Sequence, residues 1–349
     1  MHTRYNRLMT KTFKQMSLEE LRAFVSERGL PSFRFAQLAS WVYQKGVSSY
    51  DEMTNLSKAM RQDLAAELPL SLPIVANRQI SRDGTRKYVL RFDDDALAET
   101  VAIPSSDGRL TICCSSQAGC AMGCTFCATG KGGLARSLYP GEIADQITIA
   151  GRDMGMRVSN VVVMGQGEPF ANYDNTLAAL RIMNDTKLLN IGARHITVST
   201  CGILPGIERF GHEPEQFTLA VSLHSAVQKT RDALMPGVKG APLDKLRSSL
   251  VRYSDSSGRR FSLEYALIAD INDDAEHLEA LTRFCRGLLC HVNLIPLNKV
   301  EGSPFLPSSR STIAHWQSEL DAKGIAVTVR RSAGSDIAGA CGQLANAEK

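Results

Sequence analysis

Three cysteines stand at a spacing that suits an iron–sulfur cluster. Cys120, Cys124 and Cys127 form a C-x₃-C-x₂-C run directly after a β-type stretch. Three thiolates are one short of the four protein ligands that a structural zinc ion normally takes. They match a 4Fe–4S cluster that keeps one iron open, where a small molecule can bind and be reduced. The run therefore predicts a redox cofactor site.

The remaining cysteines keep an alternative open. The chain has nine cysteines, of which five fall between residues 113 and 127. Because the number is odd and the basic N-terminus carries no apolar leader, we expect metal binding or catalysis rather than a disulfide framework. Zinc remains possible, since Cys113 or Cys114 could supply a fourth ligand. This alternative predicts a zinc-stabilised RNA-binding protein without catalytic activity.

The composition is that of a globular protein with a sizeable core. The 349 residues are 44% hydrophobic and 22% charged, which excludes disordered and collagen-like chains. The longest apolar run is a handful of residues, far short of the ~20 that span a bilayer. We expect a soluble, cytoplasmic protein with no membrane partner.

Residues 1–85 are predicted to form a small basic helical module. Ser17 and Glu20 make a capping box, and apolar residues recur at helical spacing over 34–45 and 56–68. Residues 1–90 hold 14 Lys and Arg against 8 Asp and Glu, whereas the remainder holds 26 against 28. A basic module suits a phosphate backbone, so we expect an RNA-binding accessory domain. The cations expected to be exposed on it are Arg34, Lys45, Lys58 and Arg61.

A β-type connector over 86–110 leads into alternating strands and helices over 111–349. Strands are expected at 86–92, 99–103, 110–115, 160–164, 195–199, 217–223, 261–267, 292–297 and 326–330, and helices at 140–154, 174–185, 243–254 and 274–289. This alternation predicts βαβ units and a parallel sheet, open or closed into a barrel. Ligands bind such sheets at the C-terminal strand ends. The rule selects the loop after Ser115, residues 165–169, 199–202 and 222–224, and Asn298.

The cysteine run, placed after the first strand of such an array, resembles that of the radical S-adenosylmethionine (SAM) superfamily. The resemblance implies an α/β fold, a partial (β/α)₆ barrel, and one 4Fe–4S cluster on the three cysteines with SAM chelated to the open iron. One-electron reduction would cleave SAM to a 5′-deoxyadenosyl radical that abstracts hydrogen from a target. A Gly-Glu-Pro turn meets the SAM amino group in this superfamily, which assigns that role to Gly167 and Glu168.

Seven further motifs match one family within this superfamily. They lie at residues 99–104, 113–120, 164–169, 197–200, 222–224, 293–298 and 340–344. They are similar to motifs of the RlmN family of dual-specificity adenine-C2 methyltransferases. The resemblance implies methylation of adenine 2503 in 23S rRNA and adenine 37 in tRNA. The related Cfr family methylates C8 of the same rRNA adenosine and is the nearest alternative; a radical SAM enzyme acting on a peptide or metabolite is a further one.

The same resemblance implies a role for individual residues. Two SAM molecules are consumed per methylation, and Cys341 takes the first methyl group to become S-methylcysteine. Cys113 helps release the product by forming a disulfide with Cys341, and Glu99 matches a proton acceptor. The residues implied to contact SAM are Ser199, Ser222, Leu223, His224 and Asn298. Because Cys341 lies in a glycine-flanked run, we expect its segment to be mobile.

The chain departs from the family pattern at a few positions. Gln166 stands where the family commonly has Met, and Ala338 stands where it often has an acid. Cys114 adds a second thiol beside Cys113, so the sequence leaves open which of the two resolves the adduct. The partners implied are 23S rRNA, tRNA and an electron donor such as flavodoxin or ferredoxin, and we expect a monomer.

Overall fold

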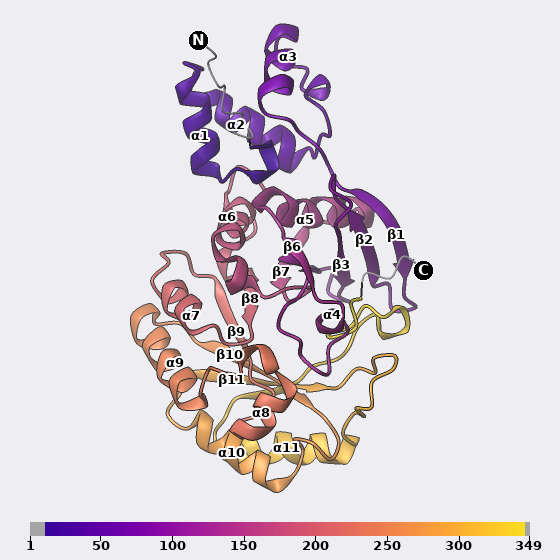
Figure 1. Cartoon of the computed structure of the whole chain (residues 1–349), viewed down its shortest axis with the longest axis vertical. Helices are drawn as coiled ribbons and strands as arrows, with labels where there is room; N and C mark the ends of the chain where they lie inside the picture. Colours follow the sequence, from indigo (N-terminus) through magenta and orange to yellow (C-terminus); the bar gives the residue numbers. More distant parts are fainter. Residues whose placement is uncertain (1–10, 346–349) are drawn as a thin grey trace, which may run out of the picture.

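The computed structural model describes residues 11–345, in which a helical N-terminal part sits on a larger α/β core (Figure 1). The helical part contains α1 (Leu18–Glu27), α2 (Phe33–Ala39) with a π-helical continuation at Ser40–Gln44, α3 (Lys58–Glu67), and 3₁₀ turns at Phe13–Gln15 and Tyr50–Glu52. Ser17 caps α1, since its hydroxyl accepts from the Glu20 N–H while the Glu20 carboxylate accepts from the Ser17 N–H. The predicted capping box is thereby confirmed.

The helical part ends at Glu67, whereas we expected it to end at residue 85. The next element is a strand, β1 (Ile74–Ile80), which pairs antiparallel with β2 (Arg86–Arg91) and so belongs to the core sheet. β1 is an edge strand with most of its residues exposed. Because no side chain of β1 is fully buried, the strand lacks the apolar alternation from which a strand is recognised in sequence.

Two of the four cations expected to be exposed on the helical part are exposed. Lys45 and Lys58 reach solvent, with the Lys45 ammonium 3.4 Å from the centroid of a tryptophan ring. Arg34 is half-buried and donates to Gln37, and the half-buried Arg61 donates to a backbone carbonyl at 2.7 Å. The two arginines are therefore partly committed to the fold.

The core is built on one ten-stranded sheet with the order β1-β2-β3-β4-β7-β8-β9-β10-β11-β12. Its further strands are β3 (Leu97–Pro104), β4 (Leu110–Cys114), β7 (Val158–Val163), β8 (Ile196–Thr200), β9 (Thr218–Ser222), β10 (Phe261–Leu267), β11 (Cys290–Pro296) and β12 (Val327–Val329). β1 to β4 are antiparallel, and every pairing from β4 to β12 is parallel. The expected connector at 86–110 is thus part of the barrel sheet.

Six parallel strands are each followed by at least one helix, as a (β/α)₆ barrel requires. The helices are α5 (Pro140–Met154), α6 (Tyr173–Asn184), α7 (Leu204–Gly211), α8 (Gln228–Leu234), α9 (Leu243–Ser257), α10 (Ala275–Cys285) and α11 (Arg310–Ala322). They cover the outside of the curved sheet, and β12 adds a seventh parallel strand (Figure 1). The strand order runs from β1 to β12 without closing, so the barrel is partial, as predicted.

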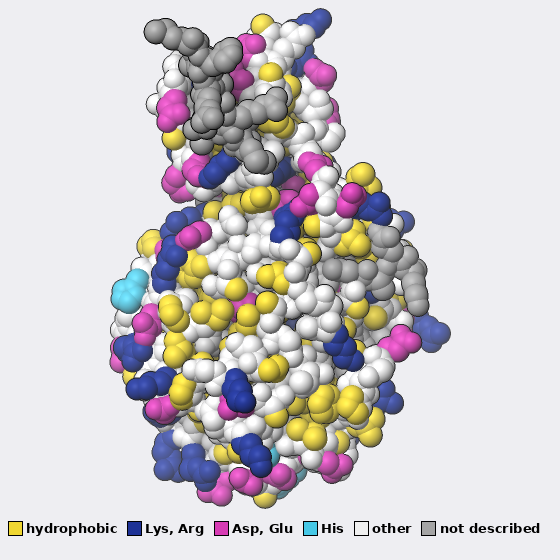
Figure 2. Space-filling view, viewed as in Figure 1, with side chains coloured by type: hydrophobic (Ala, Val, Ile, Leu, Met, Phe, Trp, Pro, Cys, Tyr) yellow, Lys and Arg dark blue, Asp and Glu magenta, His cyan; other side chains and the backbone are white. Residues whose placement is uncertain are grey.

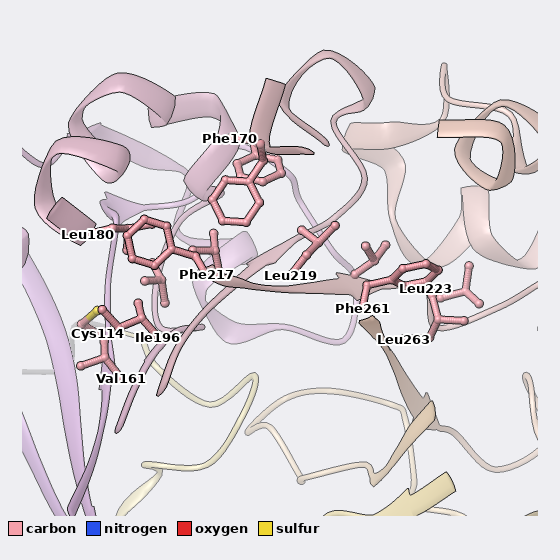
Figure 3. Packing of buried hydrophobic residues seen from close by; sticks show 14 of the residues in the cluster. Cys114, Val161, Phe170, Leu180, Ile196, Phe217, Leu219, Leu223, Phe261 and Leu263 are labelled. Carbon is pink, nitrogen blue, oxygen red and sulfur yellow. The ribbon is translucent and has the colours of Figure 1, made fainter. Parts of the chain in front are cut away.

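Apolar side chains pack between the sheet and these helices. Figure 3 shows this cluster, in which Cys114 of β4 lies beside Val161 of β7 and Ile196 of β8. A short hairpin of β5 (Gln117–Gly119) and β6 (Leu134–Ser137) and the helix α4 (Ala128–Lys131) form a separate layer at the C-terminal strand ends. The hairpin and α4 hold the cysteine loop between them.

The helical part is docked on α5 and α6 through a shared apolar cluster and a buried ion pair. Ile182 and Leu188 from the core pack into the cluster of the helical part. Lys14 forms an ion pair with Asp145 of α5 at 2.5 Å, with both side chains almost fully buried. The two parts are therefore joined by a buried interface.

The surface of the described residues is mixed in charge. On the face in Figure 2, Lys and Arg side chains follow the edge of the core over α7, α9 and α10 and alternate with Asp and Glu. Among residues 11–345, no helix combines the length and the apolar composition that crossing a membrane requires.

Candidate active site

A cavity of about 390 Å³ lies at the C-terminal ends of the parallel strands. Its lining includes residues predicted from strand ends and cysteine spacing, namely Cys120, Cys124, Cys127, Gly167, Glu168, Ser199, Ser222, His224 and Asn298, and also Cys113 and Cys341, which the family resemblance implied. These residues come from β4, the cysteine loop, the ends of β7, β8, β9 and β11, and the C-terminal segment. The cavity thus lies where the strand-end rule predicts a ligand site, and the site residues remain a prediction.

The cysteine loop is fixed from three sides. The Cys120 N–H donates to the Gly133 carbonyl at 2.8 Å, and the loop also bonds to Leu234 at 3.0 Å and to Gly342 at 2.7 Å. Gly119 has a φ of 82°, and a Cβ there would lie 2.1 Å from the Gly133 carbonyl oxygen. Only glycine allows this close approach, so the residue before Cys120 is dictated by the turn that presents the thiol.

The chemistry of the three thiols fits a cationic cluster. Burial, together with the neighbouring cysteines, raises the pKa of Cys124 to about 12; burial likewise raises the pKa of Cys120. These shifts favour the protonated thiols, and a cation between the three sulfur atoms would favour the thiolates instead. Within residues 11–345, no three His, Cys, Asp or Glu side chains converge on one metal ion. A 4Fe–4S cluster with one open iron takes three thiolates, whereas a structural zinc ion normally takes four protein ligands, so the donor set fits the cluster.

Gly167 and Glu168 form a tight turn after β7. Gly167 has a φ of 97°, and a Cβ there would lie 2.5 Å from the Gln117 side chain. Glu168 is buried, with one carboxylate oxygen accepting from the Phe170 N–H at 2.9 Å and the other from the Cys201 N–H at 2.7 Å. Burial raises the pKa of Glu168. The turn therefore holds a carboxylate rigidly at the cavity wall, where it can meet an ammonium group.

His224 is neutral and faces the cavity. It has a φ of 53°, and its Nδ1 accepts from the Ala266 N–H at 3.0 Å. Burial lowers the pKa of His224 to about 3. Phe126 of the cysteine loop packs edge-on against the imidazole, with ring centroids 4.8 Å apart. The ring is thus held in one orientation beside the cysteine loop.

Cys113 and Cys114 point to opposite faces of β4. Cys113 lines the cavity, whereas Cys114 lies in the apolar cluster shared with the helices (Figure 3). Consecutive strand residues face opposite sides of a sheet, so both thiols cannot reach the cavity. Burial raises the pKa of Cys113 to about 12, and the nearby Cys341 raises it while Arg330 lowers it. Of the two thiols, Cys113 is therefore the one that lines the same cavity as Cys341.

The segment that carries Cys341 is held by a series of hydrogen bonds, contrary to the free run that its glycines suggested. The Cys341 carbonyl accepts from Asn298 Nδ2 at 3.1 Å. Thr129 donates to the Leu344 carbonyl at 2.7 Å, and Ser81 of the β1–β2 turn donates to Asp336 at 2.5 Å. The segment therefore has a defined path across the cavity.

Glu99 lies under this segment rather than on the cavity wall. It is fully buried on β3, and its Oε2 accepts from the Ala345 N–H at 2.7 Å. Lys87 lies 3.3 Å from its Oε1. The Glu99 backbone N–H donates to Gln166 Oε1 at 3.1 Å. Gln166, at which the chain departs from the family pattern, therefore ties β3 to the Gly-Glu-Pro turn.

Comparisons with known proteins agree with this geometry over almost the whole chain. Residues 12–69 match the family model described as the ribosomal RNA large subunit methyltransferase N-terminal domain, and residues 114–281 match the radical SAM superfamily. The probable dual-specificity RNA methyltransferase RlmN of Alkaliphilus metalliredigens is 43% identical over 330 residues, covering 94% of this chain and 93% of that protein. The protein of the same name from Symbiobacterium thermophilum is 44% identical over 335 residues, covering 95% and 90%.

The chain belongs to the RlmN family.

A solved relative extends the agreement to three dimensions. A radical SAM methyltransferase from Sphaerobacter thermophilus superposes with a TM-score of 0.91 at 42% identity, covering 97% of this chain and 100% of that one. The fold is therefore that of a radical SAM methyltransferase. The first family model ends at residue 69, close to the end of α3, which agrees with the boundary that the strands define.

One residue implied by the RlmN resemblance lies away from the cavity. The Leu223 side chain is fully buried in the apolar cluster, between the cavity-lining Ser222 and His224 (Figure 3). Successive side chains of an extended chain point to opposite sides. Because Leu223 faces the helices, Ser222 and His224 face the cavity. The Leu223 side chain therefore supports the pocket from behind.

Two residues of this RlmN-family site were not anticipated from the sequence. Arg330 lines the cavity directly after β12, 3.8 Å from the buried Glu264 of β10. The strand-end rule could have identified Arg330, since it closes the last predicted strand. Glu264 lies inside a strand, and no sequence signal singles it out.

Proposed function

We propose that this protein methylates C2 of adenosine in RNA, at adenine 2503 of 23S rRNA and adenine 37 of tRNA. The curated relatives are named dual-specificity RNA methyltransferases, and the family model over residues 12–69 describes a large-subunit rRNA methyltransferase. The observation that carries the proposal is that Cys341 lines one cavity with Cys113 and the three-cysteine loop, although it lies far from them in the sequence.

The residues that would hold the cofactors are those at the strand ends. Cys120, Cys124 and Cys127 would bind a 4Fe–4S cluster; SAM would bind against Gly167, Glu168, Ser199, Ser222, His224 and Asn298. When bound, the cluster supplies one electron for the cleavage of SAM to a hydrogen-abstracting radical and recovers one electron as the product forms. An external one-electron donor such as flavodoxin or ferredoxin would first reduce the cluster.

The chain's own thiols explain how an unreactive carbon is methylated. C2 of adenine carries no acidic hydrogen, so displacement on a SAM methyl does not occur there. Cys341 Sγ instead takes the methyl of a first SAM by displacement. Loss of one hydrogen atom from this methyl leaves a methylene radical on Cys341, which forms a carbon–carbon bond to C2. A second SAM is consumed in this hydrogen abstraction.

Release of the product requires a base and a second thiol. C2 loses its hydrogen as a proton to Glu99, and the adduct gives up one electron, which the bound cluster would take up. The Cys113 thiolate then attacks Cys341 Sγ, so the bond from sulfur to methylene breaks and a disulfide forms. The released carbon takes up a proton and becomes the methyl group.

The helical N-terminal part would hold the RNA backbone while the target base enters the cavity unstacked from its neighbours. Lys45 and Lys58 are the exposed cations that support this contact. Its substrates place the protein in the cytoplasm.

Trideuteromethyl-SAM tests the proposal with the reconstituted enzyme and a 23S rRNA fragment or tRNA. We expect 2-methyladenosine that keeps two deuterium atoms, and 5′-deoxyadenosine that gains one. Cys341→Ser should abolish the product, whereas Cys290→Ser, at the start of β11 and outside the cavity lining, should not. 8-Methyladenosine would assign the C8 chemistry instead. A product with all three deuterium atoms would contradict the thioether route.

A further inference from the structure

Lys87 is a buried lysine on the face of the sheet that the Cys341 segment covers. In the antiparallel pair of β2 and β3, Lys87 is opposite Val101, and Val89 is opposite Glu99. Lys87 and Glu99 are therefore diagonal neighbours on one face, where long side chains reach each other. Val101 is in turn opposite Cys113 of β4, which places all three functional groups on the same face.

The contacts of Lys87 join this face to the Cys341 segment. Its Nζ lies 3.3 Å from Glu99 Oε1 and donates to the Ala338 carbonyl at 3.4 Å. The other carboxylate oxygen of Glu99 accepts from the Ala345 N–H at 2.7 Å. The Lys87 and Glu99 side chains are 5% and 0% exposed. The pair thus binds the C-terminal segment through hydrogen bonds on both sides of Cys341.

The two oxygens of Glu99 are not equivalent. Oε2 is committed to the Ala345 N–H, whereas Oε1 is buried and accepts no hydrogen bond from the described residues. A buried carboxylate oxygen without a donor is costly unless a cation lies beside it. The Lys87 ammonium supplies that cation while its hydrogen bond goes to Ala338. Oε1 therefore has a free lone pair with the Lys87 ammonium beside it.

We propose that Lys87 is a positioning residue for the proton transfer that resolves the RNA adduct. It lies beside Glu99 Oε1 without donating a hydrogen bond to it, which leaves Oε1 free to accept the C2 proton, and through the Ala338 carbonyl it ties Glu99 to the segment that carries Cys341. In this step the C2–H bond breaks, its electron pair stays in the adenine ring, and the proton goes to Glu99 Oε1. The inference rests on the proposed function, in which Glu99 is the proton acceptor.

The test follows the covalent enzyme–RNA adduct by denaturing gel and mass spectrometry in single-turnover reactions of the reconstituted enzyme. Lys87→Met and Glu99→Gln should both acquire the Cys341 methyl and form the adduct, then resolve it about 10²-fold more slowly than the parent, the lower range that a positioned base contributes. Lys87→Arg should recover part of the rate. Arg78→Met is the matched control, because it removes a cation of the same hairpin that pairs with Asp153 instead.

The outcomes separate this inference from the proposed function. If Glu99→Gln accumulates the adduct and Lys87→Met resolves it at the parent rate, the role of Lys87 is overturned and C2 methylation stands. If both variants resolve it normally, the assignments of Glu99 and Lys87 fail together. Accumulation in Lys87→Met but not in Arg78→Met supports the inference.

A second measurement needs no cofactor and no turnover. Hydrogen exchange of peptides spanning residues 334–345 in the cluster-free protein should be at least several-fold faster in Lys87→Met than in the parent, and near the parent rate in Lys87→Arg. Unchanged exchange in Lys87→Met would show that Lys87 does not hold the segment. It would overturn the inference whatever the activity of the enzyme.

Discussion

Replacing Lys14 by Met tests how the helical part is held on the core. Lys14 and Asp145 form an ion pair at 2.5 Å, with side chains 4% and 1% exposed, and Asp145 Oδ2 has no hydrogen-bond partner among the described residues. Burial raises the pKa of Asp145 to about 6, although Lys14 lowers it. Met keeps most of the packing of the lysine stem and removes the charge.

The loss of folding stability in Lys14→Met depends on pH, because Asp145 can become neutral by binding a proton and then no longer needs a cation beside it. Its pKa in the folded protein lies above the usual 3.8, so its favourable contribution is complete below about pH 4 and is lost as the pH rises through 6. Without Lys14 this pKa rises further. Each pH unit above 6 then costs the variant up to about 1.4 kcal/mol more than the parent, or about 3 kcal/mol at pH 8.

Urea unfolding of parent and variant at pH 5 and pH 8 measures this difference. We expect the two proteins to differ by less than about 1 kcal/mol at pH 5, where Asp145 is protonated in both, and by about 2–3 kcal/mol at pH 8. Lys14→Met combined with Asp145→Asn should remove the pH dependence. An equal loss of stability at both pH values would refute the reasoning, since it would trace the effect to packing alone.

Three further predictions concern the site and the RNA contact. Cys113→Ser should trap the enzyme–RNA adduct on denaturing gels, whereas Cys114→Ser, buried on the helix side, should release product normally; equal trapping would contradict the assignment. Gly167→Ala should cost about 1–3 kcal/mol of stability in thermal unfolding and weaken SAM binding in equilibrium dialysis, because of its φ of 97° and the 2.5 Å approach to a neighbouring side chain. Unchanged values would show that the turn adapts. The double variant Lys45→Glu with Lys58→Glu should weaken RNA binding in filter-binding assays. The slope of the logarithm of the binding constant against the logarithm of salt concentration should fall by about one to two units, and an unchanged slope would contradict the proposed RNA contact.

The strands and their C-terminal ends could be predicted because burial leaves a pattern in the sequence. β10 (Phe261–Leu267) and α5 (Pro140–Met154) fall where apolar periodicity places them. Strand alternation could also have separated Cys113 from Cys114, and Leu223 from its neighbours, without coordinates. The family resemblance assigned roles to these residues without regard to the face on which each one lies.

The remaining features depend on contacts between distant segments. The ion pair of Lys87 with Glu99 joins two strands and a terminal segment some 240 residues further along the chain, and no local pattern encodes it. β1 is exposed and has one neighbour, so its residues carry no burial signal. The order in the Cys341 segment likewise comes from hydrogen bonds to β1–β2, α4 and Asn298, which outweigh the freedom of its glycines.

Nucleoside mass spectrometry in a bacterium that lacks its own adenine-C2 methyltransferase tests the central claim most directly. The chain is expressed there, and the 23S rRNA and tRNA pools are digested separately. The account predicts 2-methyladenosine in both pools, and its loss in Cys341→Ser expressed at an equal level. If iron-loaded protein accumulates and neither pool contains 2-methyladenosine, the proposed reaction is wrong.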